Sequence, residues 1–600
     1  MKKLFLLNLP YLLFVYPFDK LAQAFRLAPS ADLSGKLLSI GDGFTAAFSS
    51  PWLSFHPTDL LIGIAGAVIL RMAVYLKGKN AKKYRHGIEY GSARWGTAAD
   101  IAPYMDKDFF QNIPMTQTER ITMASRPKQP KYARNKNILV IGGSGSGKTR
   151  FFCKPSLLQA HSSYVCTDPK GTLLPEIGTF LERKKYRIKC LNLINFRKSM
   201  KYNPLAYIRS EKDILKLVNA LIMNTKGEGE KSSEDFWVKA ERLYYSTLIG
   251  YIWYEATEEE KNFITLLDLI NASEAREDDE TYQSPVDLLF SQLEEREPDH
   301  FAVKQYRKFK MAAGKTAKSI LISLGVRLEK FNLPQIAAVV CHDELNIPAL
   351  GEHKTALFAV IPDNDSSLNF IIGMMYSSIF QELYYVADQV YGGRLPVHVH
   401  CVMDEFANVA LPDEFDKLLA TMRSREISVS IIIQNIAQLK ALFEKQWESI
   451  IGNCDEFLYL GGNETSTHKM ISESYLGRAT IDTNTYGKST GRSGSYSTNY
   501  QLSGRELYTA DEVRMLDNRY ALLFIRGEHP IQDEKYDILR HPNISFTADG
   551  GMPPYMHGQA PLAFDPGEVL LSGEYGDHEA LSEEEIFKLY NNESEEKKDD

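Results

Sequence analysis

The pattern of apolar and polar positions divides the chain into three kinds of segment. Residues 4–18 and 60–76 are two apolar runs, each somewhat short for a membrane span of about 20 residues. Further along, short runs rich in Val, Ile and Leu alternate with amphipathic stretches, which is typical of an α/β domain. Residues 208–333 instead repeat apolar positions at helical spacing. The pattern predicts two transmembrane helices, an α/β body and an all-helical insertion.

Basic residues flank the two apolar runs. Lys2 and Lys3 precede the first run, and the second is followed by Lys77, Lys79, Lys82, Lys83 and Arg85. By the positive-inside rule, both ends lie in the cytoplasm, with roughly 40 residues outside between the spans. We therefore expect a multi-pass membrane protein with both termini cytoplasmic. A signal peptide fits the first run less well, because no small-residue cleavage site follows cleanly, and two buried core helices remain an alternative.

A glycine-rich turn directly follows an apolar run at residues 137–141. It fits the P-loop pattern G-x-x-x-x-G-K-[ST] and predicts a strand, a phosphate-binding turn and a helix. Lys148 can reach the β- and γ-phosphates of ATP, and the Thr149 hydroxyl can bind Mg²⁺. The expected nucleotide-binding residues are Gly142, Gly143, Ser144, Gly145, Ser146, Gly147, Lys148 and Thr149. The alternative is a glycine-rich turn that binds nothing, which a full match after a strand disfavours.

A second apolar run, residues 397–403, ends in Asp404 and Glu405. This matches the Walker B pattern, in which the first acid holds Mg²⁺ and the second activates the attacking water. Together with the P-loop it predicts an ATP hydrolase with ATP and Mg²⁺ as cofactors. His398 and His400 alternate on the same strand and could bind a metal, but hydrogen-bonded side chains are the favoured interpretation.

Other residues near predicted strand ends are candidates for the same chemistry. Gln434 closes the strand at residues 427–433, where it can touch the γ-phosphate or orient water. Arg423 and Arg425 are candidates for an arginine finger, although an exposed arginine is more often a surface charge. Asp168 ends another strand, and either a role in the site or a simple turn is compatible with the sequence.

The remaining segments complete the expected domain organisation. Residues 120–136 are rich in Lys and Arg and predict a solvated linker, and residues 481–504 are rich in Ser, Thr, Gly, Tyr and Asn and predict a mobile loop. The expected domains are an anchor at 1–80, the first part of the nucleotide-binding domain at 81–207, an all-α domain at 208–333, its second part at 334–541, and an acidic, largely disordered tail at 542–600.

Composition limits the classes of function. The formal net charge is −8, so the chain as a whole does not attract nucleic acid, and any DNA contact requires local basic patches. The six cysteines are scattered without a C-x-x-C pair, which argues for reduced thiols and against a zinc site.

The motifs occur in an order that resembles a known family. Two amino-terminal spans precede these motifs: Gly91-Ser92-Ala93-Arg94-Trp95-Gly96, the P-loop, Asp168-Pro169-Lys170-Gly171, Asn203-Pro204-Leu205, and Asp404-Glu405 with Arg423 and Gln434 downstream. The set resembles the TraG-type coupling proteins of type IV secretion and conjugation systems, in the form carried by conjugative elements of Gram-positive bacteria. The resemblance covers approximately residues 1–540.

The resemblance implies a membrane-anchored, RecA-like ATPase with an all-α domain, assembled as a homo-hexamer around a channel. It implies recruitment of a relaxase–single-stranded DNA complex and its transport toward type IV secretion channel proteins. Two alternatives remain: a coupling ATPase that exports only protein effectors, and a double-stranded DNA translocase of FtsK type. The latter class usually ends in a winged-helix DNA reader, which the acidic tail does not offer.

The resemblance also implies residue roles. Lys148, Thr149, Asp404, Glu405 and Gln434 would serve the ATP of one subunit, and Arg423 would act on the ATP of a neighbour. No motif identifies the DNA-facing residues. The helix expected at residues 300–328, which carries a run of lysines, is a candidate because phosphate contact needs clustered positive charge.

Overall fold

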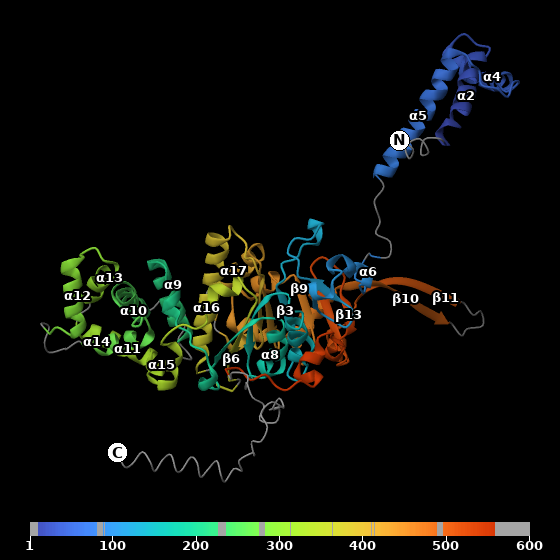
Figure 1. The fold of residues 1–600 in the computed structure, drawn as a ribbon. Helices are drawn as coiled ribbons and strands as arrows, with labels where there is room; N and C mark the ends of the chain where they lie inside the picture. Colours follow the sequence, from blue (N-terminus) through green and yellow to red (C-terminus); the bar gives the residue numbers. More distant parts are fainter. Residues whose placement is uncertain are drawn as a thin grey trace, which may run out of the picture. The chain divides into compact units, whose positions relative to one another are not determined.

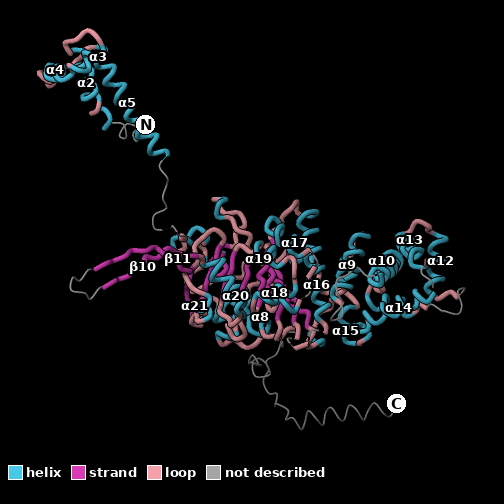
Figure 2. The backbone as a smooth tube through the Cα atoms, turned by 180° about the vertical axis from the view of Figure 1, so that it is seen from behind, coloured by secondary structure: helices cyan, strands magenta, loops and turns pink. Residues whose placement is uncertain are grey.

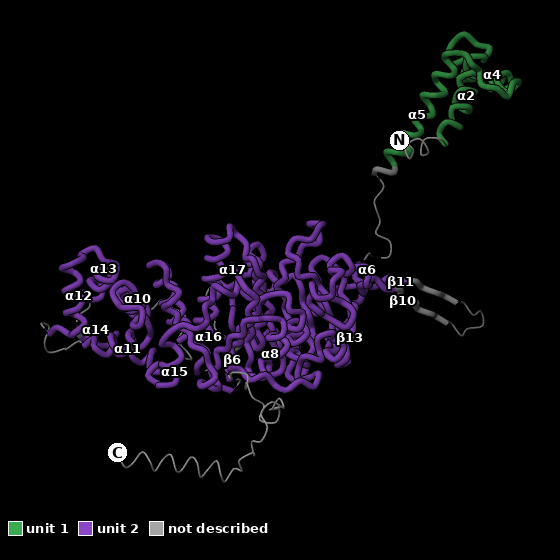
Figure 3. The backbone as a smooth tube through the Cα atoms, in the orientation of Figure 1, with its two compact units in different colours: residues 1–89 green, residues 90–600 purple. Residues whose placement is uncertain are grey.

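The computed structural model describes residues 10–558 except 81–87, 89, 226–235, 275–281, 312–313, 363, 366, 410, 413 and 489–495. The chain forms two compact units, Met1–Glu89 and Tyr90–Asp600 (Figure 3). Each unit is described by itself.

The first unit is built around α5 (Pro57–Asn80). Within the described residues, α5 contains the one segment long and apolar enough to cross a membrane, Pro57–Lys77. The remaining helices of the unit are α2 (Val15–Leu27), α3 (Leu33–Leu38) and α4 (Ile40–Ala47). Of the first predicted span, residues 4–9 lie outside the described part, as do Lys82, Lys83 and Arg85 of the basic flank. One membrane helix therefore has structural support, and the second remains a prediction.

Helix α2 packs along α5 through glycines. A Cβ atom at Gly63 would lie 2.9 Å from the Val15 carbonyl oxygen, and one at Gly66 would lie 2.5 Å from the Phe18 ring. Small residues permit this close approach of two helices in an apolar environment. Arg26, near the end of α2, pairs with Asp59, near the start of α5, at 2.9 Å, and Tyr11, which precedes α2, lies beside Arg71 further along α5, so the two helices run antiparallel.

The second unit contains a nine-stranded sheet in the order β13-β12-β9-β3-β8-β7-β4-β6-β5 (Figure 1). All neighbours are parallel except those of β12. The strands are β3 (Ile138–Ile141), β4 (Ser163–Asp168), β5 (Arg187–Asn192), β6 (Thr355–Val360), β7 (Val399–Met403), β8 (Ile427–Ile433), β9 (Glu456–Tyr459), β12 (Tyr520–Ile525) and β13 (Ile531–Glu534). A separate pair joins β1 (Asn112–Pro114) to β2 (Arg120–Thr122).

Both faces of the sheet are covered, as its continuous apolar strands require. On β3, Leu139 and Ile141 belong to one hydrophobic core, while Ile138 and Val140 belong to the other. Figure 2 shows the helices around the strands. The helices of this part are α6 (Ala98–Ile101), α7 (Lys154–Leu157), α8 (Leu173–Arg183), α16 (Asn369–Tyr385), α17 (Phe415–Met422), α18 (Ile436–Leu442), α19 (Trp447–Gly452), α20 (Thr465–Met470) and α21 (Ala510–Arg514).

The chain between β5 and β6 is helical wherever the structure describes a regular element, as the apolar spacing predicted. Its helices are α9 (Glu211–Asn224), α10 (Phe236–Glu255), α11 (Phe263–Asn271), α12 (Pro285–Arg296), α13 (Phe301–Lys310), α14 (Gly314–Arg327) and α15 (Pro334–Val340). The helix expected at 300–328 is thus two helices. The proposed domain boundaries remain predictions, because residues 90–600 form one compact unit.

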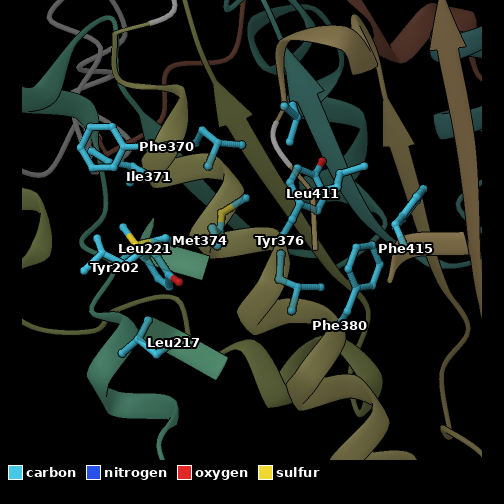
Figure 4. Close-up of a cluster of buried hydrophobic side chains, with 14 of the residues drawn as sticks. Tyr202, Leu217, Leu221, Phe370, Ile371, Met374, Tyr376, Phe380, Leu411 and Phe415 are labelled. Atoms are coloured by element: carbon cyan, nitrogen blue, oxygen red, sulfur yellow. The ribbon is translucent and has the colours of Figure 1, made fainter. Parts of the chain in front are cut away.

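Helix α16 joins this helical segment to the sheet. Figure 4 shows Met374 of α16 and Leu221 of α9 in one cluster of buried side chains, with Phe380 beside Phe415 of α17. The Phe380 and Phe415 ring centroids are 5.9 Å apart, and the Tyr376 hydroxyl lies 2.8 Å from Thr167 of β4. A shared apolar core therefore connects α9 to the strands that carry the motifs.

The prediction of a mobile loop at residues 481–504 is wrong. The structure has an antiparallel hairpin, β10 (Arg478–Lys488) and β11 (Tyr496–Glu506), with Ile481 paired to Ser503. Its base is fixed by Gly91, whose carbonyl accepts from Thr480, and by Ala93, which donates to the Arg478 carbonyl. The segment is polar, but Thr and Tyr favour extended backbone, and the strand partner is supplied locally.

Part of the expected acidic tail packs against the nucleotide-binding domain. Asn543 donates to the Leu158 carbonyl at 2.9 Å, Asp549 pairs with Lys154 at 2.7 Å, and Tyr555 covers Gly178 of α8. Residues 542–558 therefore belong with that domain, and residues 559–600 lie outside the described part. The expected solvated linker at 120–136 is likewise corrected, because Arg134 and Lys136 are buried.

Candidate nucleotide site

The P-loop lies between the carboxyl end of β3 and a short helical segment. Gly145 and Gly147 adopt φ angles of 75° and 85°, which glycine reaches without a steric penalty. A Cβ at Gly147 would also lie 2.4 Å from the Phe151 ring. The loop is fixed to its neighbours, since Gly142 N–H donates to Ile433 of β8 and Gly143 N–H donates to Gly461 after β9. The glycines predicted to bind phosphate therefore form a turn held on both sides.

Lys148 and Thr149 already have polar partners in this structure. The Lys148 ammonium donates to the Gly142 carbonyl at 3.0 Å, across its own loop. The Thr149 hydroxyl donates to Asp404 at 2.8 Å, which joins the P-loop to the Walker B strand. A hydroxyl and a carboxylate at this separation are oxygen ligands suited to Mg²⁺, so the two residues fit the predicted metal site.

The Walker B residues follow β7, and β8 lies between β7 and the P-loop strand. Asp404 is buried and accepts from the Glu405 N–H at 3.0 Å. Glu405 adopts a left-handed conformation with φ 50°, which costs a non-glycine residue about 1–3 kcal/mol and is common at active sites. This backbone turns the Glu405 side chain toward the same edge of the sheet as the P-loop.

One cleft of about 280 Å³ brings the predicted residues together. Lys148, Thr149, Asp404, Glu405 and Gln434 all line it. The other lining residues are Ser144, Gly145, Gly147, Arg150, Asp168, Pro169, Lys170 and Thr172. The sequence interpretation missed Arg150, Lys170 and Thr172, and the Asp168-Pro169-Lys170-Gly171 motif was the signal that could have identified Lys170.

Asp168 has a structural role that the sequence left open. Its buried carboxylate accepts from the backbone N–H of Leu173 at 2.8 Å and of Thr172 at 3.2 Å, at the start of α8. Burial raises the pKa of Asp168, while these backbone hydrogen bonds oppose the shift. Asp168 therefore satisfies two backbone donors at the start of α8 and orders the turn that carries Lys170 at the cleft.

The histidine pair is hydrogen-bonded as the favoured interpretation expected. His398 lies 2.7 Å and His400 2.6 Å from the Ser428 hydroxyl. Burial lowers the pKa of His400 to about 3, so its ring is neutral at physiological pH. No group of three or more metal-ligating side chains is found in the described part of the chain.

Arg423 lies at the amino-terminal ends of the parallel strands, whereas this cleft lies at their carboxyl-terminal ends. It begins a turn, Arg423–Arg425, that precedes the amino end of β8, whereas Gln434 follows the carboxyl end. The length of β8 separates them by about 20 Å at ~3.3 Å per residue. Arg425 is engaged by Asp388 at 2.7 Å. Arg423 is therefore not part of the cleft in its own subunit.

The family model for type IV secretory system conjugative DNA transfer matches residues 104–547. The chain belongs to this family. VirD4 of Rhizobium radiobacter is 21% identical over 523 residues, which are 84% of this chain and 71% of VirD4. The match includes both halves of the nucleotide site.

Solved structures of the plasmid coupling protein TrwB share the fold. The complex with the non-hydrolysable ATP analogue ADPNP has a TM-score of 0.54 and 16% identity, covering 75% of this chain and 95% of that chain. The complex with ADP and Mg²⁺ has a TM-score of 0.53 and 15% identity, with the same coverage. This likeness shows that the second unit shares the fold of TrwB.

A second lysine, Lys535, contacts the P-loop from the segment that follows the edge strand β13. Lys535, just after β13, is 6% exposed and donates to the Ser146 carbonyl at 3.0 Å and to Asn518 at 2.7 Å. Its ammonium also lies 5.3 Å from the centre of the Phe151 ring. Burial lowers the pKa of Lys535 to about 8. No sequence motif marked this residue, because it follows an edge strand almost 390 positions away.

We expect Lys535→Met to weaken ATP binding about tenfold, because leaving the Ser146 carbonyl without its donor costs ~1–2 kcal/mol of P-loop order. Titration with a fluorescent ATP analogue measures this, and turnover at saturating ATP should change little. Lys445→Met, at an exposed lysine, is the matched control. Unchanged affinity in Lys535→Met would mean that the lysine does not order the loop.

A larger hollow of about 810 Å³ lies between α9 and α16 and is lined by residues such as Arg209, Tyr385 and Leu411. It contains none of the P-loop or Walker B residues. The larger hollow therefore lacks the loop backbone and the lysine that phosphate binding requires.

Proposed function

We propose that this chain is a membrane-anchored ATPase that couples a relaxase–single-stranded DNA complex to a type IV secretion channel and drives its translocation during conjugation. The observation that carries the proposal is the convergence of Lys148, Thr149, Asp404, Glu405 and Gln434 in one cleft, in a chain of the conjugative DNA transfer family. VirD4 and the TrwB complexes support the same role by similarity.

Each residue has a defined task in this proposal. The P-loop amides and the Lys148 ammonium bind the phosphates, and Lys148 exchanges the Gly142 carbonyl for them. Thr149 and Asp404 hold Mg²⁺, which supplies charge neutralisation on the phosphates when bound. Glu405 accepts a proton from the attacking water, and Gln434 orients that water.

The proposal includes a homo-hexamer in which the nucleotide lies at a subunit boundary. The cleft of about 280 Å³ is slightly smaller than the ~300–1,000 Å³ usual for ligand pockets, which is compatible with a wall completed by a neighbour. Arg423, at the other edge of the sheet, would be the residue that a neighbouring subunit receives. An arginine finger of this kind accelerates phosphoryl transfer about 10³–10⁵-fold.

The membrane anchor in this proposal is a pair of antiparallel spans with both termini in the cytoplasm. Supporting it are the apolar α5, the close packing of α2 against Gly63 and Gly66, and the basic residues beyond each predicted span. ATP is then available to the second unit on the cytoplasmic side.

The DNA-facing residues remain outside this assignment. Two lysines of the former candidate helix are paired with carboxylates, since Lys304 lies 3.1 Å from Asp299 and Lys310 lies 2.7 Å from Asp287. Paired ammonium groups release fewer counterions from DNA, so this helix is a weak phosphate contact.

The test is ATP turnover by the full-length protein in lipid nanodiscs with and without nucleic acid. We expect single-stranded DNA to stimulate turnover several-fold, with salt dependence, because backbone contacts dominate such binding. Stimulation by double-stranded DNA alone would favour an FtsK-type translocase. Export of protein by the same system without any DNA response or transfer would favour an effector-only ATPase.

A further inference from the structure

A buried hydrogen-bonded cluster fastens the turn that carries Arg423. Glu426 ends this turn in a left-handed conformation with φ 61°, and its N–H donates to the Arg423 carbonyl at 3.3 Å. The Glu426 side chain is buried, and it pairs with Arg394 at 2.8 Å and lies 3.0 Å from His398. The backbone of the turn and a buried carboxylate are thus fixed at the same residue.

Ser125 connects this carboxylate to the Arg423 guanidinium. Its hydroxyl donates to Glu426 Oε2 at 2.8 Å, and its carbonyl accepts from Arg423 Nη2 at 3.1 Å. Ser125 is 5% exposed, although it belongs to the segment that the sequence presented as a solvated linker. Glu426, Ser125 and Arg423 therefore form a closed ring of hydrogen bonds. The ring includes both the backbone carbonyl and the guanidinium of Arg423.

The cluster continues into the Walker B strand. His398 contacts Ser428 at 2.7 Å, and His400 contacts Ser428 at 2.6 Å and Ser430 at 3.0 Å. These histidines lie at the start of the run that ends in Asp404 and Glu405, so the Arg423 turn is attached to that strand. Burial by itself would raise the pKa of Glu426, but hydrogen bonding to His398 and Ser125 and the charge of Arg394 lower it, which keeps the carboxylate ionised.

We propose that Glu426 is a positioning residue for Arg423, acting through Ser125 and the left-handed turn to hold the guanidinium for the nucleotide of a neighbouring subunit. This inference rests on the proposed role of Arg423 between subunits. A charged group that acts on a transferring phosphoryl must be held closely, since a misplacement of about 1 Å can cost ~10²-fold in rate. The ring of contacts supplies that rigidity without touching the nucleotide cleft of its own subunit.

Glu426→Gln in the full-length protein tests the inference. It preserves size and the left-handed backbone, but it removes the charge that faces Arg394, Ser125 and His398. We expect kcat for ATP to fall about 10- to 100-fold, with KM and nucleotide affinity unchanged, because the P-loop lies at the other edge of the sheet. Asp388→Asn is the matched control: Asp388 lies in the segment Val386–Val390 and pairs with Arg425 of the turn, and loss of this pair at the surface should alter kcat by less than ~2-fold.

Mixed oligomers separate positioning from misfolding. Glu426→Gln subunits mixed with Lys148→Ala subunits should regain part of the turnover, because an intact P-loop then meets an intact Arg423. Arg423→Ala mixed with Lys148→Ala is the reference. If the mixture of Arg423→Ala and Lys148→Ala subunits regains no turnover, the proposed intersubunit role of Arg423 is contradicted. If that mixture regains turnover but the mixture of Glu426→Gln and Lys148→Ala subunits does not, the present inference is overturned.

A double variant gives an answer that does not depend on mixing. Glu426→Gln added to Arg423→Ala should cause no further loss of kcat, because residues that act as a unit are not additive. Multiplied losses, or a nucleotide affinity that falls with Glu426→Gln, would overturn the inference and assign Glu426 to folding of the sheet edge.

Discussion

Replacing Lys148 by alanine is expected to abolish ATP turnover and DNA transfer while leaving membrane insertion intact. The ammonium is the charged group of the P-loop that can follow the β- and γ-phosphates, and in this structure it donates to the Gly142 carbonyl at 3.0 Å, a contact that it can exchange. Removing one preorganised charge contact from a phosphoryl-transfer site lowers turnover by at least about 10²–10³-fold. Phosphate release from the nanodisc protein and mating efficiency in cells measure the two effects.

The controls follow from the position of Lys148. The residue is far along the chain from α5, so membrane fractionation of the variant should match the parent protein. Lys445→Ala, at an exposed lysine, should retain both activities. Normal transfer by Lys148→Ala would contradict ATP hydrolysis as the energy source of this protein.

Replacing Glu405 by glutamine is expected to trap bound ATP. Glutamine keeps the side-chain length and tolerates the same left-handed backbone, so the cleft should still close around the nucleotide. It cannot accept the proton of the attacking water, and loss of general-base catalysis reduces turnover about 10²–10⁴-fold. Retention of radiolabelled ATP after rapid gel filtration, beside phosphate release, distinguishes binding from hydrolysis.

Glu414→Gln provides the matched acidic control, because Glu414 is an exposed residue that pairs with Lys417 on the surface. It should leave turnover within ~2-fold, as exposed ion pairs contribute little. If Glu405→Gln hydrolyses ATP at the normal rate, the general base is another residue. If it fails to bind ATP, Glu405 instead supports the shape of the cleft.

Lys148 and Asp404 show how far sequence can locate a site. Each follows a short apolar run, and parallel strands present their carboxyl ends at one edge, so the contact between Thr149 and Asp404 follows from two local patterns. Gln434 was placed by the same reasoning, and the structure inserts its strand between the other two. Arg423 could be singled out only through the family resemblance, and its action between subunits remains a proposal.

Other features depended on partners that are remote in sequence. Lys535 reaches Ser146 only because β13 and β12 extend the sheet past β9. The base of the β10–β11 hairpin is held by Gly91 and Ala93, and Asn543 is ordered by the Leu158 carbonyl. From composition alone, these polar segments look like loops or tails. Their order depends on hydrogen bonds to backbone groups that are distant in sequence.

The sequence by itself determined where the P-loop, the Asp404-Glu405 pair, the helical segment between β5 and β6 and the apolar α5 lie, because each is a contiguous motif or has its own periodicity. Only the tertiary structure decided which functional side chains meet at the carboxyl-terminal ends of the strands and which lie at their amino-terminal ends. It places Arg423 at the edge opposite Lys148, and it buries Glu426 and Ser125 around that arginine. The reason is physical, since strand order and the pairing of buried charges depend on contacts between residues hundreds of positions apart, which no local pattern encodes.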